Sequence, residues 1–205
     1  MYSPKHYQTD DRAFILEFMR RYNFAALVSA KNEKPFATHL PFITEENEEK
    51  VILISHLARA NPQWKDFADA EVLVIFQEPH AYISPIWYEE TLSVPTWNYV
   101  AVHARGAVKI FDEEAKVFNI LEKMISAFDE KYYEQWTHLP FGFKSNLARG
   151  IVAFEIEVTD LQGKKKLNQS SSPESRRNVI EQLGKSSNQL EVEIARLMAE
   201  NERSL

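Results

Sequence analysis

Hydrophobic residues follow two different periods along the chain, and each change of period marks a predicted element. After Thr9 and Asp10, either of which could cap a helix, apolar residues recur at helical spacing at Phe14, Ile15, Phe18, Met19 and Tyr22. A second helix is predicted from the acidic run 112–114, which is followed by apolar residues at the same spacing, namely Val117, Ile120, Leu121, Met124, Ile125 and Phe128. Both segments should bury one face and expose the other.

Short apolar runs outside these helices favour β-strands. Residues 25–30 and 35–40, separated by a polar turn, indicate a strand pair. Further strands are expected at 51–55, where the strand would end at Ser55 and His56, and at 72–76, 81–84, within 97–110, and at 151–158. These six or seven strands have helices inserted between them rather than after each one, which favours an antiparallel barrel over a doubly wound sheet.

The amino-acid composition of the chain changes after residue 160. The lysine run 164–166 is predicted to be a solvated loop, and a polar helix is expected from about residue 174 to residue 202. Between residues 161 and 185, six basic residues stand against two acidic ones, a net charge of +4. We therefore expect a β-rich domain over residues 1–160, with a basic loop and C-terminal helix, residues 161–205, appended to it.

Composition narrows the function classes. The 205 residues are 44% hydrophobic and 26% charged, which is typical of one folded domain, and the net charge of -6 argues against a wholly basic nucleic-acid binder but allows a local basic patch. The absence of cysteine excludes disulfides, thiolate nucleophiles and cysteine-ligated metals. The first residues lack a signal-peptide pattern and no long apolar run follows, so we expect a cytoplasmic protein without membrane contact.

The usual catalytic motifs are missing from the sequence. It contains no Gly-x-Ser-x-Gly elbow, no P-loop and no Gly-x-Gly-x-x-Gly fingerprint. Histidines 39, 56, 80 and 103 lie in or at the ends of predicted strands, but their spacing matches no compact ligand motif, so structural roles are favoured over a metal site. No catalytic residue and no metal ligand are assigned.

The most informative polar cluster lies at residues 55–64. Ser55 and His56 at a strand end lead through Arg59 to Asn61-Pro62, a helix-start signal for a short helix from 61 to about 68. A hydroxyl, an imidazole, a guanidinium and free backbone amides in one turn could hold a phosphate. Spacing alone favours the plainer interpretation, in which Asn61 only caps, Arg59 is solvated and His56 is a core histidine.

Aromatic residues are concentrated between residues 77 and 99, where they include Tyr82, Trp87, Tyr88, Trp97 and Tyr99. Such side chains offer flat apolar surfaces with hydrogen-bonding tips. Three interpretations stay open for this segment: core packing, a subunit interface, or a wall against a planar ligand.

Four motifs, taken in order, resemble those of the PaiB family. They are His39-Leu40-Pro41, His56-Leu57-Ala58-Arg59-Ala60-Asn61-Pro62-Gln63-Trp64, Pro79-His80-Ala81-Tyr82-Ile83-Ser84-Pro85 and Val94-Pro95-Thr96-Trp97-Asn98-Tyr99-Val100-Ala101-Val102-His103. The N-terminal residues 1–6 and the C-terminal helix extend the resemblance over nearly the whole chain.

This resemblance implies an α+β, mainly β chain with an FMN-binding split β-barrel of the pyridoxamine phosphate oxidase and flavin reductase type, peripheral helices and a C-terminal helical tail. It further implies FMN as cofactor, a homodimer, and a negative transcriptional regulator of degradative-enzyme or sporulation genes. In related barrels, the flavin phosphate is held at a turn before an Asn-Pro helix start, which here matches Ser55, His56, Arg59 and Asn61. We also expect Trp97, in the aromatic segment, to be a cofactor-binding residue.

The chain departs from the family at one motif, where the usual Lys-Leu-Ser-Gln-Asn reads Lys166-Leu167-Asn168-Gln169-Ser170. No helix-turn-helix signature is present, so a DNA or protein partner would be reached through the basic C-terminal region. Three alternatives stay open. One is an FMN-dependent oxidoreductase, in which His80 or His103 could supply a proton, and another, less supported, is a haem-binding protein. The third is an interaction module that binds no ligand and reaches its partner through residues 161–205.

Overall fold

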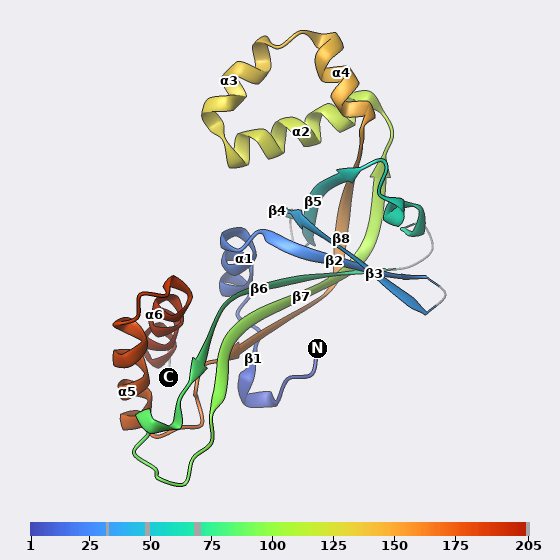
Figure 1. The fold of residues 1–205 in the computed structure, drawn as a ribbon. Coiled ribbons are helices and arrows are strands. Elements are labelled where there is room, and N and C mark those ends of the chain that lie inside the picture. The colour runs from blue at the N-terminus through green and yellow to red at the C-terminus, as the bar shows by residue number, and fades with distance from the viewer. Residues whose placement is uncertain (32, 48–49, 68–70, 204–205) are drawn as a thin grey trace. The chain divides into compact units, whose positions relative to one another are not determined.

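The fold is known from a computed structural model that describes residues 1–31, 33–47, 50–67 and 71–203 (Figure 1). Its strands are β1 Gln8–Thr9, β2 Phe24–Lys31, β3 Lys34–Pro41, β4 Ile43–Asn47, β5 Lys50–Ala58, β6 Val72–Ile83, β7 Thr96–Phe111 and β8 Ile151–Lys166. Its α-helices are α1 Arg12–Arg21, α2 Glu114–Phe128, α3 Glu130–His138, α4 Phe141–Arg149, α5 Pro173–Gly184 and α6 Gln189–Arg203. Three short 3-10 helices are η1 Lys5–Tyr7, η2 Pro62–Asp66 and η3 Pro85–Trp87.

The strands form one sheet in the order β3-β2-β6-β7-β8-β5-β4, with β1 paired to β8. The predicted strand pair is confirmed, because β2 and β3 pair antiparallel from Phe24 opposite Pro41 to Lys31 opposite Lys34. β5 pairs antiparallel with β4 on one side and with β8 on the other. The antiparallel architecture expected from the strand spacing is therefore present.

Several strands are longer than their hydrophobic runs predicted. The expected strands 72–76 and 81–84 are parts of the single strand β6, and the described residues hold eight strands instead of six or seven. The prediction of a loop at the lysine run was wrong, because β8 continues through Lys166. Gln8 and Thr9 of β1 pair with Lys164 and Gly163, and this pairing gives the lysine backbone ladder partners that the side-chain pattern does not reveal.

The two strongest helix predictions are confirmed. In α1, Ile15, Leu16, Phe18 and Met19 are buried, but the cap is Asp11 rather than Thr9 or Asp10, since Asp11 Oδ1 accepts a hydrogen bond of 3.1 Å from the Phe14 amide. The buried face of α2 is formed by Val117, Ile120 and Met124. Helices α3 and α4, which follow α2 in the excursion between β7 and β8, were not predicted (Figure 1).

The chain divides into two compact units. Unit 1 comprises residues 1–15, 77–102 and 162–205, and unit 2 comprises residues 16–76 and 103–161. Strands β6, β7 and β8 each contribute residues to both units. The core of unit 2 includes an aromatic cluster in which the ring of Phe42 lies 6.0 Å from Phe76 and 6.4 Å from Phe154.

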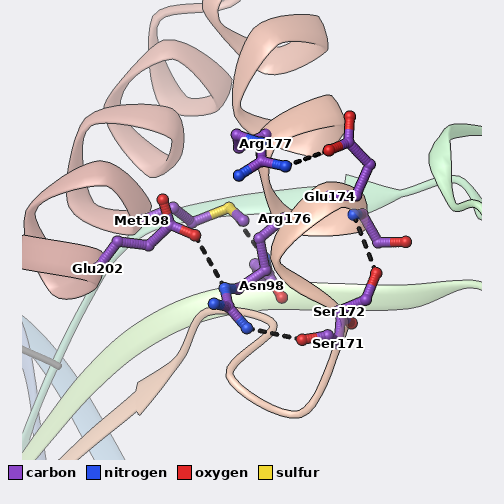
Figure 2. Close-up of polar contacts among 9 residues, drawn as sticks. Asn98, Ser171, Ser172, Glu174, Arg176, Arg177, Met198 and Glu202 are labelled. Carbon is purple, nitrogen blue, oxygen red and sulfur yellow. Dashed lines mark hydrogen bonds and ion pairs between the residues drawn. The ribbon is translucent and has the colours of Figure 1, made fainter.

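Unit 1 buries the two C-terminal helices against each other and against β7. The predicted single tail helix is two helices, α5 and α6, and both contribute fully buried residues, including Val179, Leu183 and Ile194. The buried Asn98 of β7 donates from Nδ2 to Met198 Sδ at 3.4 Å (Figure 2). None of the helices in the described ranges is both long and apolar enough to cross a membrane.

One arginine ties the start of α5 to the end of α6 (Figure 2). Arg176 donates from Nε to Glu202 Oε1 at 2.8 Å and from Nη1 to the Ser171 carbonyl at 2.6 Å. Its side chain is only 17% exposed. The neighbouring Arg177 forms an ion pair with Glu174 within α5, but its side chain is 62% exposed. The two arginines therefore differ in burial and in the distance along the chain that they bridge.

We expect Arg176→Ala to lower the free energy of unfolding by about 1.5–3 kcal/mol, because it removes charged hydrogen bonds and leaves the Glu202 carboxylate without its partner. Arg177→Ala is the matched control and should change that free energy by less than about 0.5 kcal/mol, since exposed ion pairs contribute little. Urea unfolding followed by circular dichroism measures both. Equal losses in the two variants would contradict the assigned role of Arg176.

Candidate functional site

The segment predicted to hold a phosphate begins inside a strand and not at its end. β5 was expected to stop at Ser55 and His56, but it continues through Ala58. Ser55 pairs with Phe154 of β8, and the register runs on to Ala58 opposite Ile151. This extension is explained by β8, which offers backbone partners past the end of the apolar run. Only Arg59 and the residues after it leave the strand.

Ser55 is turned into the protein. Its side chain is 0% exposed, and Oγ donates a hydrogen bond of 2.7 Å to the Pro41 carbonyl at the end of β3. A buried hydroxyl that already has an acceptor is satisfied where it lies. Ser55 thus joins β5 to the end of β3.

His56 packs beneath α2. Its Nδ1 lies 3.1 Å from Met124 Sδ, and the side chain is partly buried. Burial lowers the pKa of the imidazole below its ordinary value of 6.5, because the charged form loses its hydration. His56 is therefore a neutral ring near pH 7, which matches the plainer interpretation of this residue more closely than a charged phosphate ligand.

Arg59 is the residue of the segment that presents unused donors. Its backbone amide donates to the Gly150 carbonyl at 2.9 Å and Nε donates to the Arg149 carbonyl at 3.0 Å. The side chain is exposed, and the two terminal nitrogens have no hydrogen-bond partner in the part of the chain that the structure describes. The guanidinium is thus held at one edge while its other edge is open to a ligand.

Arg59 is one of the residues that line a cavity of about 380 Å³. The lining consists of Arg59, Asp112, Glu114, Val117, Ser145, Ala148 and Arg149. The Arg149 guanidinium donates to Asn146 Oδ1, and the Glu114 carboxylate accepts a hydrogen bond of 2.5 Å from Ser145 Oγ. Arg149 was not predicted as a site residue, because it comes from α4, a helix that the hydrophobic pattern did not indicate.

Asn61 caps the turn that follows. Oδ1 accepts from the Gln63 amide at 3.0 Å and Nδ2 donates to Thr38 Oγ1 at 2.9 Å, so both polar atoms of the amide are engaged. The helix-start signal is confirmed, but the element is the short 3-10 helix η2, Pro62–Asp66. The predicted end near residue 68 lies outside the described residues.

Gln63 anchors this turn to the β2–β3 hairpin and was not predicted to do so. Its side chain is buried, and Nε2 lies 3.1 Å from the Leu27 carbonyl and 3.2 Å from the Phe36 carbonyl. The sequence motif contained Gln63 but gave no sign of these partners, which are 36 and 27 residues away along the chain. Gln63 therefore helps to fix the turn that follows Arg59.

Trp97 lies in unit 1, whereas Ser55, His56, Arg59 and Asn61 lie in unit 2. The indole is 52% exposed, so core packing is wrong for this ring. The centroids of Tyr82 and His80 lie 5.8 Å and 5.9 Å from that of Trp97. These three side chains form one aromatic surface on β6 and β7, consistent with the ligand-wall and interface interpretations.

The histidines considered as metal ligands are dispersed. His39, His56, His80 and His103 lie in β3, β5, β6 and β7, respectively. Within the described ranges, no three His, Asp or Glu side chains come together in a way that would hold a metal ion.

The FMN implied by the sequence motifs fits the 55–61 segment through one side chain. Arg59 lines the cavity with two terminal donors that have no partner among the described residues, and an arginine fork matches phosphate oxygens, whereas the Asp112 and Glu114 carboxylates in the same lining oppose an anion. The side chains of Ser55 and Asn61 are already engaged within the protein, so they would position the segment.

Solved structures with the same fold include two flavoproteins. The flavocytochrome Anf3 from Azotobacter vinelandii matches with a TM-score of 0.65 at 11% identity, covering 80% of this chain and 72% of that one. The FAD and heme binding protein from Mycobacterium smegmatis matches with a TM-score of 0.62 at 11% identity, covering 83% of this chain and 78% of that one. The chain is thus an α+β, mainly β protein with the split-barrel fold of flavin-binding proteins, as predicted.

Sequence comparison identifies the family. The model described as "Putative FMN-binding domain" matches residues 1–160. Protease synthase and sporulation protein PAI 2 from Bacillus subtilis (strain 168) is 36% identical over 205 residues, which cover 97% of this chain and 96% of that protein. The chain belongs to the PaiB family, as its four motifs indicated.

His56 should make the stability of the protein depend on pH. Because its pKa is lowered in the folded state, the unfolded chain binds a proton more readily as the pH falls below about 6.5. The contribution of His56 to the free energy of unfolding is therefore complete above that pH and is lost as the pH falls toward the folded-state pKa. We expect His56→Gln to flatten the profile between pH 7.5 and pH 5.

Urea unfolding at several pH values measures this effect in the wild type and the variant. The difference between the two profiles isolates His56 from the other titrating groups. If both proteins lose the same stability over that range, the buried neutral imidazole is ruled out.

Proposed function

We propose that this protein is a cytoplasmic, homodimeric FMN-binding negative regulator of transcription, acting on degradative-enzyme or sporulation genes. The observation that carries the proposal is the match over nearly the whole chain to a protein named for protease synthesis and sporulation. The family model, whose description names FMN, supports the cofactor.

In this proposal Arg59 binds the FMN phosphate. Arg59 lines the 380 Å³ cavity, and its Nε donates to the Arg149 carbonyl, so one edge of the guanidinium is already held. Ser55, Asn61 and Gln63 position the segment through their contacts with β2 and β3. His56 contributes a neutral, desolvated ring beneath α2 and adds no charge.

Within unit 1, Trp97 is proposed as a contact for a flavin ring, independently of the Arg59 segment in unit 2. Its exposed indole, flanked by Tyr82 and His80, offers the flat surface that a planar heterocycle needs. When bound, the flavin would supply one- or two-electron redox chemistry, and the protein would supply binding and electrostatics.

The homodimer is proposed from apolar side chains that unit 1 leaves exposed. Ile86, Leu92 and Val94 lie close together in sequence between β6 and β7, and all are more than three-quarters exposed. Large exposed apolar groups of this kind mark interaction surfaces. A second copy of the chain would remove them from water.

A DNA or protein partner is also part of the proposal, but the C-terminal helices α5 and α6 offer it little free charge. Arg176, Arg177 and Lys185 form ion pairs with glutamates of α5 and α6. Direct reading of a DNA groove by this region is therefore disfavoured, and an indirect action on transcription is preferred.

An FMN-dependent oxidoreductase is the second candidate. His80 beside the exposed Trp97 ring places a group that can donate a proton next to the proposed flavin wall. Oxidation of a nicotinamide donor by the FMN-loaded protein would favour this candidate over a regulator that only binds.

Arg59→Ala should weaken FMN binding by about tenfold to a hundredfold, because a charged hydrogen bond to phosphate is worth about 1.5–3 kcal/mol. Isothermal titration measures the affinity, and Arg177→Ala, an arginine of unit 1 engaged with Glu174, is the control. Unchanged affinity in Arg59→Ala would remove Arg59 from the site. If the wild type did not bind FMN, FMN would be ruled out as its cofactor.

Size-exclusion chromatography with light scattering should give a mass twice that of the chain. Leu92→Asp combined with Val94→Asp should shift the protein toward the monomer, because each carboxylate would be buried in the interface. Phe141→Asp, at a position of α4 in unit 2 that is 65% exposed, is the control. A monomeric wild type would contradict the dimer, and a double variant that stays dimeric would move the interface elsewhere.

A further inference from the structure

The lysine run in β8 places two of its three side chains beside the aromatic surface of β7. Because side chains alternate along a strand, Lys164 and Lys166 share one face and Lys165 takes the other. Lys164 Nζ lies 5.0 Å from the ring centroid of Tyr99, and Lys166 Nζ donates to the Trp97 carbonyl at 2.8 Å. Lys165 instead lies over the ring of Phe14 at 3.5 Å.

Lys164 is buried and Lys166 is partly buried, and neither ammonium group has a counter-ion among the described residues. Lys164 is 7% exposed, and its hydrogen-bond acceptor is the Tyr2 carbonyl at 3.2 Å. Lys166 donates to a hydroxyl and a carbonyl, and neither lysine pairs with a carboxylate in the described part of the chain. Burial lowers the pKa of Lys166, and the nearby charge of Lys164 lowers it further.

Such an arrangement is unusual for a purely structural element. Buried charges are normally paired, and two cations of the same face repel each other. The adjoining rings are open to solvent, since Trp97 is 52% and Tyr82 is 45% exposed, whereas Asn98 and Val100 point from β7 to the buried side. The face therefore combines two lysines that have no carboxylate partner among the described residues with flat rings that are about half exposed.

We propose that this face of β6, β7 and β8 binds a small planar aromatic anion, which lies against Trp97 and Tyr82 and places its negative charge toward Lys164 and Lys166. The rings supply the apolar contact, and the lysines supply the charge complement. A nucleic-acid strand is a poorer occupant, because Lys164 lies below the surface and the whole chain carries a charge of -6.

Two ligands share this chemistry. One is the isoalloxazine ring, which becomes anionic when reduced, and the other is a separate aromatic acid. If the ligand is the flavin ring, the inference rests on the proposed function, in which Trp97 contacts that ring. If the ligand is a separate aromatic acid, the inference does not depend on the proposed function. The two sources are separated by experiments with and without flavin.

The variants Lys164→Met and Lys166→Met remove one cation each and keep much of the side-chain volume. Removal of an uncompensated desolvated charge should leave the thermal midpoint unchanged or raise it, while ligand binding falls by about tenfold to a hundredfold. Lys185→Met is the control, because Lys185 lies in unit 1 but pairs with Glu181. Trp97→Ala, which truncates an exposed ring, provides a second variant that should fold and lose the ligand.

The first arm titrates nicotinate, an aromatic carboxylate, into flavin-free protein and follows tryptophan fluorescence. Saturable binding that weakens in both lysine variants and in Trp97→Ala, but not in Lys185→Met, would identify a separate aromatic acid as the ligand. The second arm measures the midpoint potential of the FMN-loaded protein. A more negative potential in the lysine variants would identify the reduced flavin ring, because the cations favour its anionic form.

The proposal is overturned if nicotinate does not bind the wild type specifically and the lysine variants leave the flavin potential unchanged. It is also overturned if both lysine variants unfold at a clearly lower temperature without a selective loss of ligand, since the lysines would then be structural. Failure of FMN to bind would defeat the proposed cofactor, and the nicotinate arm would still decide this inference.

Discussion

The pairing of β8 with β5 at one end and with β1 at the other is the constraint on which both candidate sites depend. In unit 2, β8 pairs with β5 from Ile52 opposite Glu157 to Ala58 opposite Ile151, and this ladder carries β5 up to Arg59. The Arg59 amide then donates to Gly150, the residue before β8. In unit 1, the same strand pairs with β1, which keeps residues 163 and 164 in a ladder. Without these partners, β8 would end after its apolar half. With them, it positions Arg59 at one end and Lys164 and Lys166 at the other.

Charge is distributed unevenly over the groups that these strands position. Most basic side chains of the C-terminal helices are neutralised by glutamates, as in the Arg176–Glu202 pair. Among the described residues, the terminal nitrogens of Arg59 have no acceptor, and Lys164 and Lys166 have acceptors but no carboxylate. In an overall acidic chain, the cations without a carboxylate partner thus include one beside a cavity of unit 2 and two beside the aromatic surface of unit 1.

The sequence predicted the elements whose side chains carry their own signal. Amphipathic spacing located α1 and α2, and alternating runs located the β2–β3 hairpin. The continuity of β6 through residues 77–80 and the continuation of β8 past Val158 were missed, because polar residues there owe their conformation to neighbouring strands. Asn61 was correctly identified as a cap. Its second hydrogen-bond partner, Thr38, lies 23 residues away along the chain, so the local residue spacing does not indicate it. Arg149 enters the Arg59 cavity from a helix without a clear apolar period.

Equilibrium dialysis of the wild-type protein against FMN, with the bound flavin quantified by its visible absorption, tests the central claim most directly. The account predicts saturable binding of one FMN per chain and an altered flavin spectrum, because the ring would leave water for a protein surface. No retained FMN at a large excess of the cofactor would contradict it, and the split barrel would then have to act through a ligand other than flavin.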